Sequence, residues 1–366
     1  MERMQSTWEN VVEYDMSESG ITPVTLNELV GMGLDLDEVM NMPLGYSQSN
    51  GTPELKGLLT AVYPGSTVDN IEVTNGTSEA NYIIALSLLE PGDGFALQVP
   101  NYLQLWGVAQ SLGAKMNTFE LQSDKDWEPN WEQFEKAVNP KTKLVYISNP
   151  NNPTGSVLSE EAMKRIASRC DEVGAYLISD EVYLGAEIGD KRTPSFWGLG
   201  KNVIVTSGLS KAYGIPGVRI GWMIGPKDVV YNCWTQHDYI RIGPNKLSDR
   251  IAQIAVTLEN REKLYARTRS ILRRNLDAFR EWVASFGTLF TFKEPKAGPI
   301  CFLKYDMDVP SLSIAERVMK NQSTLIVPGS HFAMEGYIRI WLAGKSREMW
   351  DEALRRIAVE IRAMAG

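Results

Sequence analysis

The chain has 366 residues, of which 43% are hydrophobic and 22% are charged. This length suits a large domain with a smaller one, or one large α/β unit, and the composition is ordinary for a globular enzyme. The 37 basic and 45 acidic side chains give a formal net charge of -8, which argues against general binding to nucleic acid or to an anionic membrane.

The cysteines and histidines show no spacing typical of metal ligands. Cys170, Cys233 and Cys301 are scattered and odd in number, which predicts reduced thiols in or near the core of a cytoplasmic protein. Neither His237 nor His331 is expected to be catalytic, and no metal site is predicted. The N-terminus shows no apolar signal segment, and no apolar run approaches the length of a membrane span.

The N-terminal segment has little periodicity and ends in Ser17-Glu18-Ser19-Gly20. We interpret residues 1–20 as an arm that lies on another surface of the protein. The stretch 42–59 predicts a loop and then a helix, because glycines and a proline precede a short amphipathic run. Tyr46 lies in that loop.

A predicted strand over 69–73 leads through Thr74-Asn-Gly-Thr-Ser-Glu79 into a helical run over 80–89. The first backbone N–H groups of a helix lack partners within the helix, and the helix dipole favours an anion there. Gly76, Thr77 and Ser78 are therefore candidates for phosphate binding. Ordinary capping of the helix by Thr77 or Ser78 explains the same residues without a ligand.

Two further predicted strands end in polar loops. The strand over 94–99 is followed by Tyr102, at a position that suits stacking on a flat aromatic ring. The strand over 143–148 leads into Asn149-Pro-Asn-Asn-Pro-Thr-Gly155. Its prolines and glycine predict a rigid, extended turn that aims a side-chain amide accurately, and Asn152 carries such an amide.

A buried strand over 175–179 is followed by Asp180-Glu-Val-Tyr183. A carboxylate just beyond the end of a strand is suited to pair with a protonated pyridine nitrogen, and this pairing keeps a cofactor ring an electron sink. The alternative interpretation is that Asp180 caps a helix.

The stretch from Ser207 to Trp222 contains one lysine and one arginine. Lys211 lies between a predicted buried strand and a turn rich in Gly and Pro, and a lysine in a partly dry pocket attacks an aldehyde readily. Arg219 offers a planar set of donors for a phosphate. Together these groups indicate an aldehyde that carries a phosphate, which fits pyridoxal phosphate (PLP). A surface turn that carries Lys and Arg by chance is the alternative.

The last third of the chain is predicted to contain a long helical region over 247–286, a hairpin over 290–305 and a closing helix over 346–364. A strand is predicted over 337–342. Arg339 alternates there with apolar neighbours, so we expect it to face inward or to lie at the edge of a cleft. A buried arginine paired with a core acid is the structural alternative.

The stretch around Lys211 has the form Ser-Lys-x-x-Gly-x-x-Gly-x-Arg-x-Gly. This stretch resembles the cofactor-lysine motif of the class I/II aminotransferases, which are PLP-dependent enzymes of fold type I. The run from Asn149 to Gly155 resembles the Asn-Pro-x-Asn-Pro-Thr-Gly signature of the same family. The resemblance extends from Tyr46 to Arg339 and implies a Schiff base between Lys211 and PLP, with Lys211 as general base and acid.

The resemblance also implies roles for the other candidate residues. Asp180 keeps the ring nitrogen protonated, Asn152 and Tyr183 bind O3′ of the ring, and Tyr102 stacks on the ring. The residues implied at the phosphate are Gly76, Thr77, Ser78, Ser207, Ser210, Arg219 and, from the neighbouring subunit of a homodimer, Tyr46.

In the substrate site, the resemblance implies that Arg339 binds the α-carboxylate bidentately, with Asn152 nearby. The N-terminal segment runs beside the active site in this family, so Glu18 and Gly20 are candidates for contact with substrate. Glu18 could pair with a cationic substrate, and a fixed loop that docks the end of the chain is the alternative for this residue.

Two features depart from the common family pattern. The residue three before the lysine is often Ser or Thr in the family but is Gly208 here, so one phosphate hydroxyl is missing or is supplied by Ser207. The run Ser17–Gly20 and the stretch around Lys211 resemble PLP-dependent cyclases that close a ring on a hydroxylated arginine derivative. The resemblance therefore leaves two reaction outcomes open, transamination and cyclisation.

The expected fold is α/β, fold type I. A large domain over 46–245 is expected around a mostly parallel, mixed seven-stranded sheet, with a small α+β domain from 1–45 and 246–366 that includes the N-terminal arm. The expected activity is transfer of an amino group from an amino acid to a 2-oxo acid. The alternative is cyclisation of, or elimination from, an arginine-like or β/γ-substituted amino acid.

Overall fold

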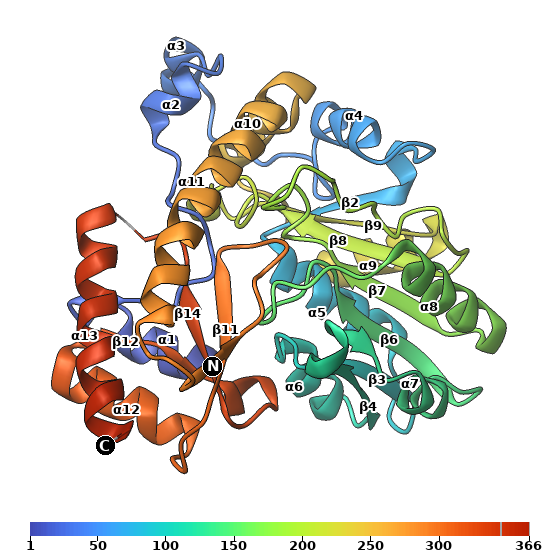
Figure 1. The fold of residues 1–366 in the computed structure, drawn as a ribbon. Coiled ribbons are helices and arrows are strands. Elements are labelled where there is room, and N and C mark those ends of the chain that lie inside the picture. The colour runs from blue at the N-terminus through green and yellow to red at the C-terminus, as the bar shows by residue number, and fades with distance from the viewer. Residues whose placement is uncertain (345, 366) are drawn as a thin grey trace.

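The computed structural model describes residues 1–344 and 346–365. Its largest element is an eight-stranded sheet in the order β2-β9-β8-β7-β6-β3-β4-β5, which fills the right-hand half of Figure 1. The strands are β2 (Ile71–Thr74), β3 (Gly94–Val99), β4 (Lys115–Gln122), β5 (Glu128–Pro129), β6 (Thr142–Ser148), β7 (Tyr176–Asp180), β8 (Val203–Gly208) and β9 (Gly221–Ile224).

The large sheet is mostly parallel. Strands β8, β7, β6, β3 and β4 pair in parallel, whereas β9 is antiparallel to both β8 and β2. The mixed, mostly parallel sheet of the expected fold is therefore confirmed. One strand more than expected is present, because the two-residue β5 pairs antiparallel with β4 at the edge, and so short a strand has no alternation of side chains to reveal it.

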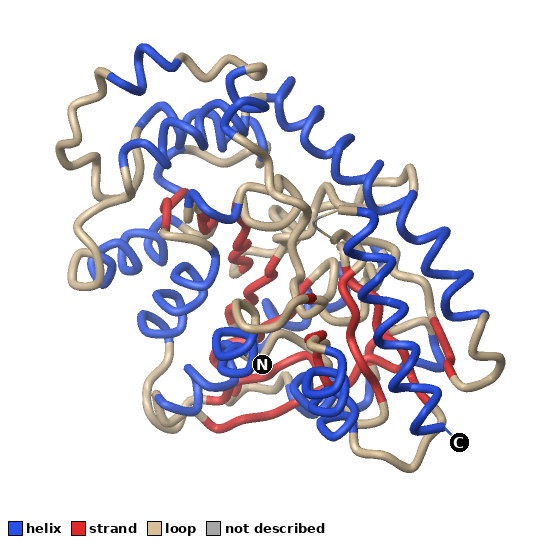
Figure 2. The backbone as a smooth tube through the Cα atoms, turned by 90° about the vertical axis from the view of Figure 1, so that its left-hand side faces the viewer, coloured by secondary structure: helices blue, strands red, loops and turns tan. Residues whose placement is uncertain are grey.

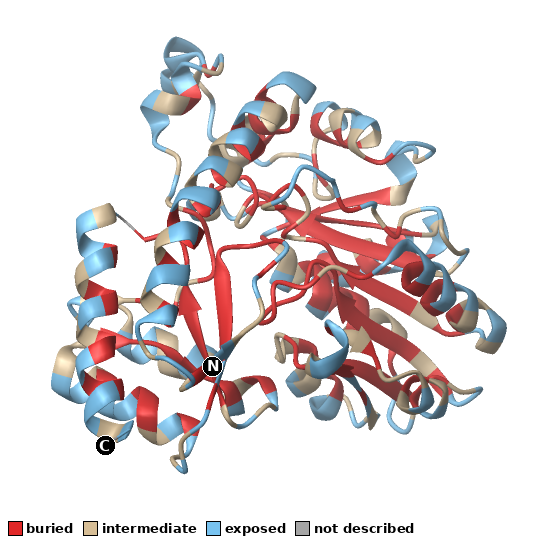
Figure 3. Ribbon diagram, viewed as in Figure 1, coloured by how far each residue is buried: buried red, intermediate tan, exposed pale blue. Residues whose placement is uncertain are grey.

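Both faces of the large sheet are buried. Val145 and Ile147 of β6 belong to one hydrophobic cluster, and Leu144 and Tyr146 belong to another, as alternation along a strand requires. The first cluster includes side chains of α4 (Pro53–Val62), α7 (Trp131–Ala137) and α8 (Glu160–Val173), and the second includes those of α5 (Thr77–Leu88), α6 (Gln104–Ser111) and α9 (Lys227–His237). Figure 3 shows buried strands between helices with exposed outer faces, and Figure 2, coloured by secondary structure, shows the strands with helices around them.

A second sheet is antiparallel and has the order β10-β11-β14-β13. Its strands are β10 (Phe290–Phe292), β11 (Ile300–Tyr305), β13 (Val327–Pro328) and β14 (Tyr337–Trp341). The helices of this half, at the left of Figure 1, are α11 (Leu258–Ala284), α12 (Ser311–Gln322) and α13 (Arg347–Ala365). The expected hairpin over 290–305 is present, with Phe290 opposite Tyr305.

The long helical region expected over 247–286 is two helices, α10 (Lys246–Val256) and α11. The break lies at Thr257, which has an extended ψ of 147°. Its hydroxyl accepts a hydrogen bond from the backbone N–H of Asn260 at 3.4 Å and so caps α11. The amphipathic pattern continues across this cap residue, so the sequence predicts one helix where the structure has two.

The N-terminal arm contains more regular structure than expected. Residues Glu2–Trp8 form α1, which buries none of its residues and therefore has no apolar stripe in the sequence. The strand β1 (Tyr14–Asp15) then pairs in parallel with β12 (Thr324–Leu325). The short helices α2 (Leu26–Val30) and α3 (Leu36–Met40) precede α4.

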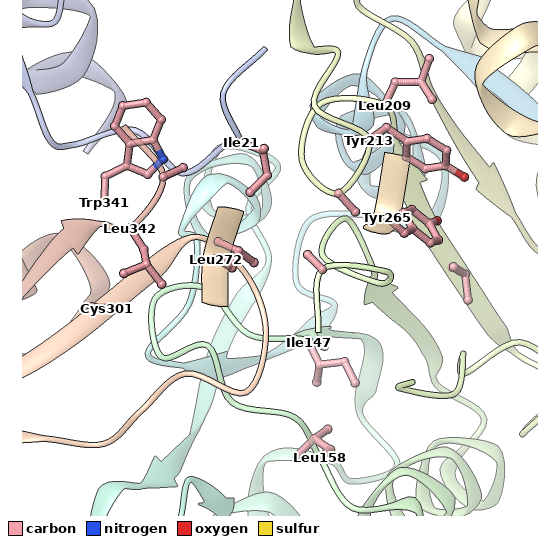
Figure 4. Close-up of a cluster of buried hydrophobic side chains, with 14 of the residues drawn as sticks. Ile21, Ile147, Leu158, Leu209, Tyr213, Tyr265, Leu272, Cys301, Trp341 and Leu342 are labelled. Carbon is pink, nitrogen blue, oxygen red and sulfur yellow. The ribbon is translucent and has the colours of Figure 1, made fainter. Parts of the chain in front are cut away.

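One hydrophobic cluster joins the two sheets and the arm. It contains Ile21 from the arm, Ile147 from β6 and Cys301 from β11, all of which are labelled in Figure 4. The indole N–H of Trp341 donates to the carbonyl of Gly20 at 2.6 Å, which fixes the arm to β14. The expected domain limits stay a prediction. Within the described residues, no helix has both the length and the apolar character to cross a membrane.

Candidate active site

The loops that follow β3, β6, β7 and β8 meet at a cavity of about 290 Å³. Parallel strands end at the same edge of a sheet, which is where open α/β sheets bind ligands. Many of the candidate residues line this cavity: Glu18, Thr77, Ser78, Tyr102, Asn152, Asp180, Tyr183, Ser210, Lys211 and Arg219. Met1, Glu2 and Ser19 of the arm line it as well. A larger groove of about 790 Å³ lies between α1 and α12 and shares only Met1 with this cavity.

The amine of Lys211 faces the N-terminal arm. Lys211 lies in the turn after β8 and is half-buried, and its Nζ donates to Oγ of Ser19 at 2.9 Å. The carbonyl of Ser19 accepts from the hydroxyl of Tyr183, also at 2.9 Å. Burial raises the pKa of Tyr183, so this hydroxyl is a neutral donor. A single residue of the arm therefore binds two of the groups for which a chemical role was expected.

Asp180 is the last residue of β7 and is 6% exposed. Its Oδ2 accepts from the side-chain amide of Asn81 at 3.2 Å and from the hydroxyl of Tyr146 at 3.1 Å. Its Oδ1 accepts from the backbone N–H of Val182 at 3.2 Å. Burial raises the pKa of Asp180, and these hydrogen bonds oppose that rise. The carboxylate contacts its neighbours from the end of a strand and does not cap a helix.

Asn81 and Tyr146 were not among the candidate residues. Each stands in an otherwise apolar run, Asn81 in the helix that follows the phosphate candidates and Tyr146 in a central strand. A lone polar group in such a run must find a partner inside the protein. That requirement is the sequence signal that points to both residues.

The N-terminus of α5 has the form expected of an anion site. Gly76 precedes the helix with a φ of 93°, and no side chain caps the first turn. This positive φ favours glycine, and a Cβ at position 76 would also meet the guanidinium of Arg219, which lies directly against the turn. Arg219 itself donates to Oγ of Ser210 at 3.3 Å. Backbone amides, hydroxyls and a guanidinium meet here, and this set of donors fits a phosphate group.

The glycine at position 208 is required by packing. A Cβ there would lie 2.9 Å from Oγ1 of Thr77 and 2.9 Å from the carbonyl oxygen of Ile220. The hydroxyl of Thr77 therefore lies where a side chain at position 208 would project. Ser207 does not replace that hydroxyl: it points to the opposite face of β8 and donates to the carbonyl of Glu181 at 3.3 Å. The structure thus places Ser207 outside the cavity.

Arg339 is fully buried, with 0% exposure, at the edge of the site. Its guanidinium donates to Oδ1 of Asn152 at 3.0 Å and to the carbonyl of Ser17. Both of these partners are neutral oxygens, and the Nε atom of Arg339 has no hydrogen-bond partner. The ring of Phe332 lies under the guanidinium at 5.1 Å. The positive charge is therefore suited to a carboxylate.

Glu18 folds back on the arm. Its Oε2 accepts from the backbone N–H groups of Ser19 at 2.9 Å and Gly20 at 2.8 Å. Burial opposes its ionisation, but the Lys211 ammonium and these two amides outweigh burial and lower the pKa of Glu18. Glu18 is thus an anion at neutral pH that lines the cavity, and Gly20 takes part through its backbone.

The remaining two tyrosines differ in position. Tyr102 lines the cavity and is half-buried, and burial raises its pKa, so its hydroxyl is neutral. Tyr46 is 85% exposed and does not reach the cavity of its own chain.

The fold and the cavity define a fold type I, PLP-dependent enzyme. The sequence matches the family described as aminotransferase class I and II over residues 38–357, and the chain belongs to that family. PLP is the cofactor of this family, and the hydrogen-bond donors around the cavity fit it.

Relatives with different reactions resemble the chain. It is 26% identical over 352 residues to capreomycidine synthase of Streptomyces vinaceus, across 95% of this chain and 89% of that protein. It is 30% identical over 336 residues to valine–pyruvate aminotransferase of Mycobacterium tuberculosis, across 86% of this chain and 82% of that protein. Its fold is similar to that of a PLP-dependent aminotransferase from Streptococcus suis, with a TM-score of 0.92, 29% identity and coverage of 99% and 97% of the two chains.

Proposed function

We propose that this chain is an aminotransferase that moves an amino group from an amino acid to a 2-oxo acid, with Lys211 as the cofactor lysine. The observation that supports this most strongly is that Lys211, Asp180, Asn152 and Tyr183 line one cavity. When bound, PLP supplies an electron sink for the electrons left behind when a substrate loses its Cα proton.

The proposal gives each side chain a task toward the cofactor. Asp180 pairs with the ring nitrogen, Tyr102 stacks on the ring, and Asn152 and Tyr183 donate to the ring oxygen. Because Oδ1 of Asn152 is taken by Arg339, the amide nitrogen of Asn152 is the donor that is left for the ring. The phosphate binds at the N-terminus of α5, where the donors are Thr77, Ser78, Ser210 and Arg219.

Arg339 and Lys211 act on the amino acid. Arg339 binds the α-carboxylate and thereby fixes the direction in which Cα–H points. Lys211 takes the proton from Cα as a general base and returns it as a general acid. Arg339 is fully buried and its guanidinium donates to the carbonyl of Ser17, so we expect the substrate carboxylate to take the place of that carbonyl as an acceptor.

Single-turnover chemistry tests the proposal. The PLP-loaded enzyme is mixed with one amino acid at a time, without any 2-oxo acid, and the products are measured by mass spectrometry. An aminotransferase forms one equivalent of 2-oxo acid and one of pyridoxamine phosphate and then stops until a 2-oxo acid is added. Many turnovers in the absence of a 2-oxo acid would contradict it.

A second candidate function is cyclisation of, or elimination from, an amino acid with a cationic, arginine-like side chain. The observation that favours it is Glu18, an anion that lines the cavity beside Lys211. The relative with 26% identity over 95% of this chain is named capreomycidine synthase, so the relatives include an enzyme that is not named as an aminotransferase. Repeated turnover of such an amino acid without a 2-oxo acid would select this candidate.

We also propose that the enzyme is a homodimer in which Tyr46 reaches the neighbouring cavity. Leu44, Tyr46, Tyr239 and Ile242 are apolar or aromatic side chains that are more than half exposed. Their two loops lie together, since Oγ of Ser47 donates to the carbonyl of Pro244 at 2.7 Å. An exposed apolar patch of this kind is typical of an interface.

Light scattering and PLP titration test the dimer. We expect twice the chain mass of 40.9 kDa, and weaker PLP binding by Tyr46→Ala than by the control Leu312→Ala, an exposed residue on α12. A monomer that binds PLP with undiminished affinity would contradict the proposal.

A further inference from the structure

We propose that Asn81 and Tyr146 are positioning residues that hold Asp180 as a charged partner for the ring nitrogen of the cofactor. This inference rests on the role proposed above for Asp180. Neither side chain is assigned a contact with substrate or with phosphate. Both are neutral, and both donate to the same carboxylate oxygen.

The two donors approach Asp180 from different elements. Asn81 is 1% exposed and lies on α5, one turn beyond Thr77, whereas Tyr146 is 0% exposed and lies on β6 beside β7. Their contacts with Oδ2 are 3.2 and 3.1 Å long. Oδ1 receives only the backbone N–H of Val182 among the hydrogen bonds to described residues. The pair therefore occupies Oδ2 and leaves Oδ1 with room for another donor.

A hydrogen bond to the oxygen of the Asn81 amide fixes the orientation of its NH₂ group. The hydroxyl of Thr206 donates to Oδ1 of Asn81 at 3.0 Å, which turns the NH₂ group toward Asp180. Thr206 lies directly opposite Asp180 in the pairing of β7 with β8. An ionised carboxylate only accepts hydrogen bonds. The chain of donors from Thr206 through Asn81 therefore favours the charged form of Asp180.

Other titratable groups around Asp180 act in both directions. Lys211 favours the charge of Asp180. Asp180 in turn disfavours ionisation of the buried Glu181 and of Tyr102. Lys211 is also the residue whose charge changes as it takes and returns a proton. The neutral donors Asn81 and Tyr146 are the part of this environment that stays constant during such a cycle.

A purely structural role makes a different prediction. Loss of either donor would then lower stability without altering the proton that Asp180 shares with the ring nitrogen. A positioning role predicts that the carboxylate becomes more basic when a donor is removed, so that it draws the shared proton away from the ring. The expected change is about one pKa unit, or tenfold in that equilibrium, for each donor.

The test uses holoenzyme loaded with PLP that carries ¹⁵N in its ring, because the ¹⁵N chemical shift reports whether the ring nitrogen is protonated. The variants are Tyr146→Phe, Asn81→Ala and the double variant. Tyr305→Phe is the matched control, since it removes another buried tyrosine hydroxyl, which donates to the carbonyl of Val309 at 2.7 Å in the second sheet. Melting temperatures are measured for all variants.

We expect the ring nitrogen to be protonated in the wild type and in Tyr305→Phe, and to move toward the unprotonated shift in each variant, most in the double. Unchanged shifts in variants that bind PLP would overturn the proposal, even if their melting temperatures fall. If the wild-type protein does not bind PLP at all, the proposed function fails instead. The carboxyl of Asp180 is then titrated by ¹³C NMR in the full chain, with Asp180→Asn to assign it, and an unchanged pKa in the variants would overturn the inference.

Discussion

Arg339 donates a hydrogen bond to Oδ1 of Asn152 at 3.0 Å and so joins the second sheet to the loop that follows β6 of the large sheet. The contact spans 187 residues of sequence. It brings the expected carboxylate-binding group of the substrate site against an expected donor to the cofactor ring. A change at either residue therefore affects both binding steps.

Replacing Arg339 with lysine tests the substrate side of this contact. Arg339→Lys keeps a positive charge but loses the planar pair of donors that a carboxylate needs. We expect kcat/KM for the amino acid to fall on the order of 10²-fold, from transition-state contacts worth about 3 kcal/mol. Arg317→Lys, in an ion pair between an exposed arginine and the buried Glu360 away from the cavity, is the control. A change of less than twofold in kcat/KM for Arg339→Lys would exclude the assigned role.

Glu18→Gln separates a substrate-recognition role from a role in shaping the arm. The amide keeps an oxygen that can accept from Ser19 and Gly20, but the negative charge is lost. If Glu18 pairs with substrate, KM for amino acids with a cationic side chain rises about tenfold, whereas KM for neutral ones changes little. An equal change for both substrate classes, with Glu9→Gln as the control, would leave Glu18 as a structural residue.

Gly208→Ser restores the residue type common in the family, and we expect it to be harmful here. Its Cβ would approach Oγ1 of Thr77 and the carbonyl of Ile220 to 2.9 Å. The N-terminus of α5 must then move away from β8, at a cost of about 1–3 kcal/mol in the free energy of unfolding. We expect weaker PLP binding as well, because Thr77 and Ser78 lie at that terminus. PLP binding as tight as in the wild type would show that the site has room for a second hydroxyl.

His237 makes the stability of the protein depend on pH. Its Nδ1 lies 2.6 Å from Glu72 and its Nε2 lies 3.2 Å from Glu79, and only the protonated ring donates to both. Burial opposes protonation, but the two hydrogen bonds outweigh burial and raise the pKa of His237 to about 9. Burial raises the pKa of Glu72 despite its contact with His237. The pKa of Glu79 is lowered, because hydrogen bonds from His237 and from the backbone N–H of Asn75 outweigh burial, so Glu79 is the more readily ionised partner of His237.

A raised pKa in the folded state stabilises the protein below the pKa of the unfolded state, about 6.5, and this contribution is lost as pH rises through about 9. Thermal unfolding of the wild type and of His237→Gln should therefore differ most below about pH 6.5, by roughly 3 kcal/mol, and least above about pH 9. His331→Gln is the control, because burial lowers the pKa of His331. A difference that does not shrink with rising pH would show that His237 is neutral in the folded protein.

The sequence predicted most of the sheet because its strands are continuous apolar runs that end in polar loops. The closing helix expected over 346–364 was also predictable from its amphipathic pattern, and it is present as α13 (Arg347–Ala365). The helix α1 was not, because none of its residues is buried. The division of the long helical region at Thr257 was missed because both helices continue the same amphipathic pattern.

Motifs located the candidate site, but they did not reveal its supporting contacts. The stretch around Lys211 and the turn at Asn152 are contiguous motifs with a fixed spacing of residues, so both can be recognised in the sequence. The contacts of Ser19 with Lys211 and of Asn81 with Asp180 join residues 192 and 99 positions apart, and only the fold brings them together. Ser207 was misplaced because neighbouring residues of a strand face opposite sides, and the side that Ser207 takes depends on where β8 pairs.

The most direct test of the central claim is the visible absorbance of the purified protein with added PLP, compared with that of Lys211→Ala. We predict a band of lysine-bound cofactor in the wild type, which changes when a substrate amino acid is added and is absent in the variant. A band of equal intensity in Lys211→Ala, or no band in a folded wild type saturated with PLP, would contradict the assignment of Lys211 as the residue that bears the cofactor.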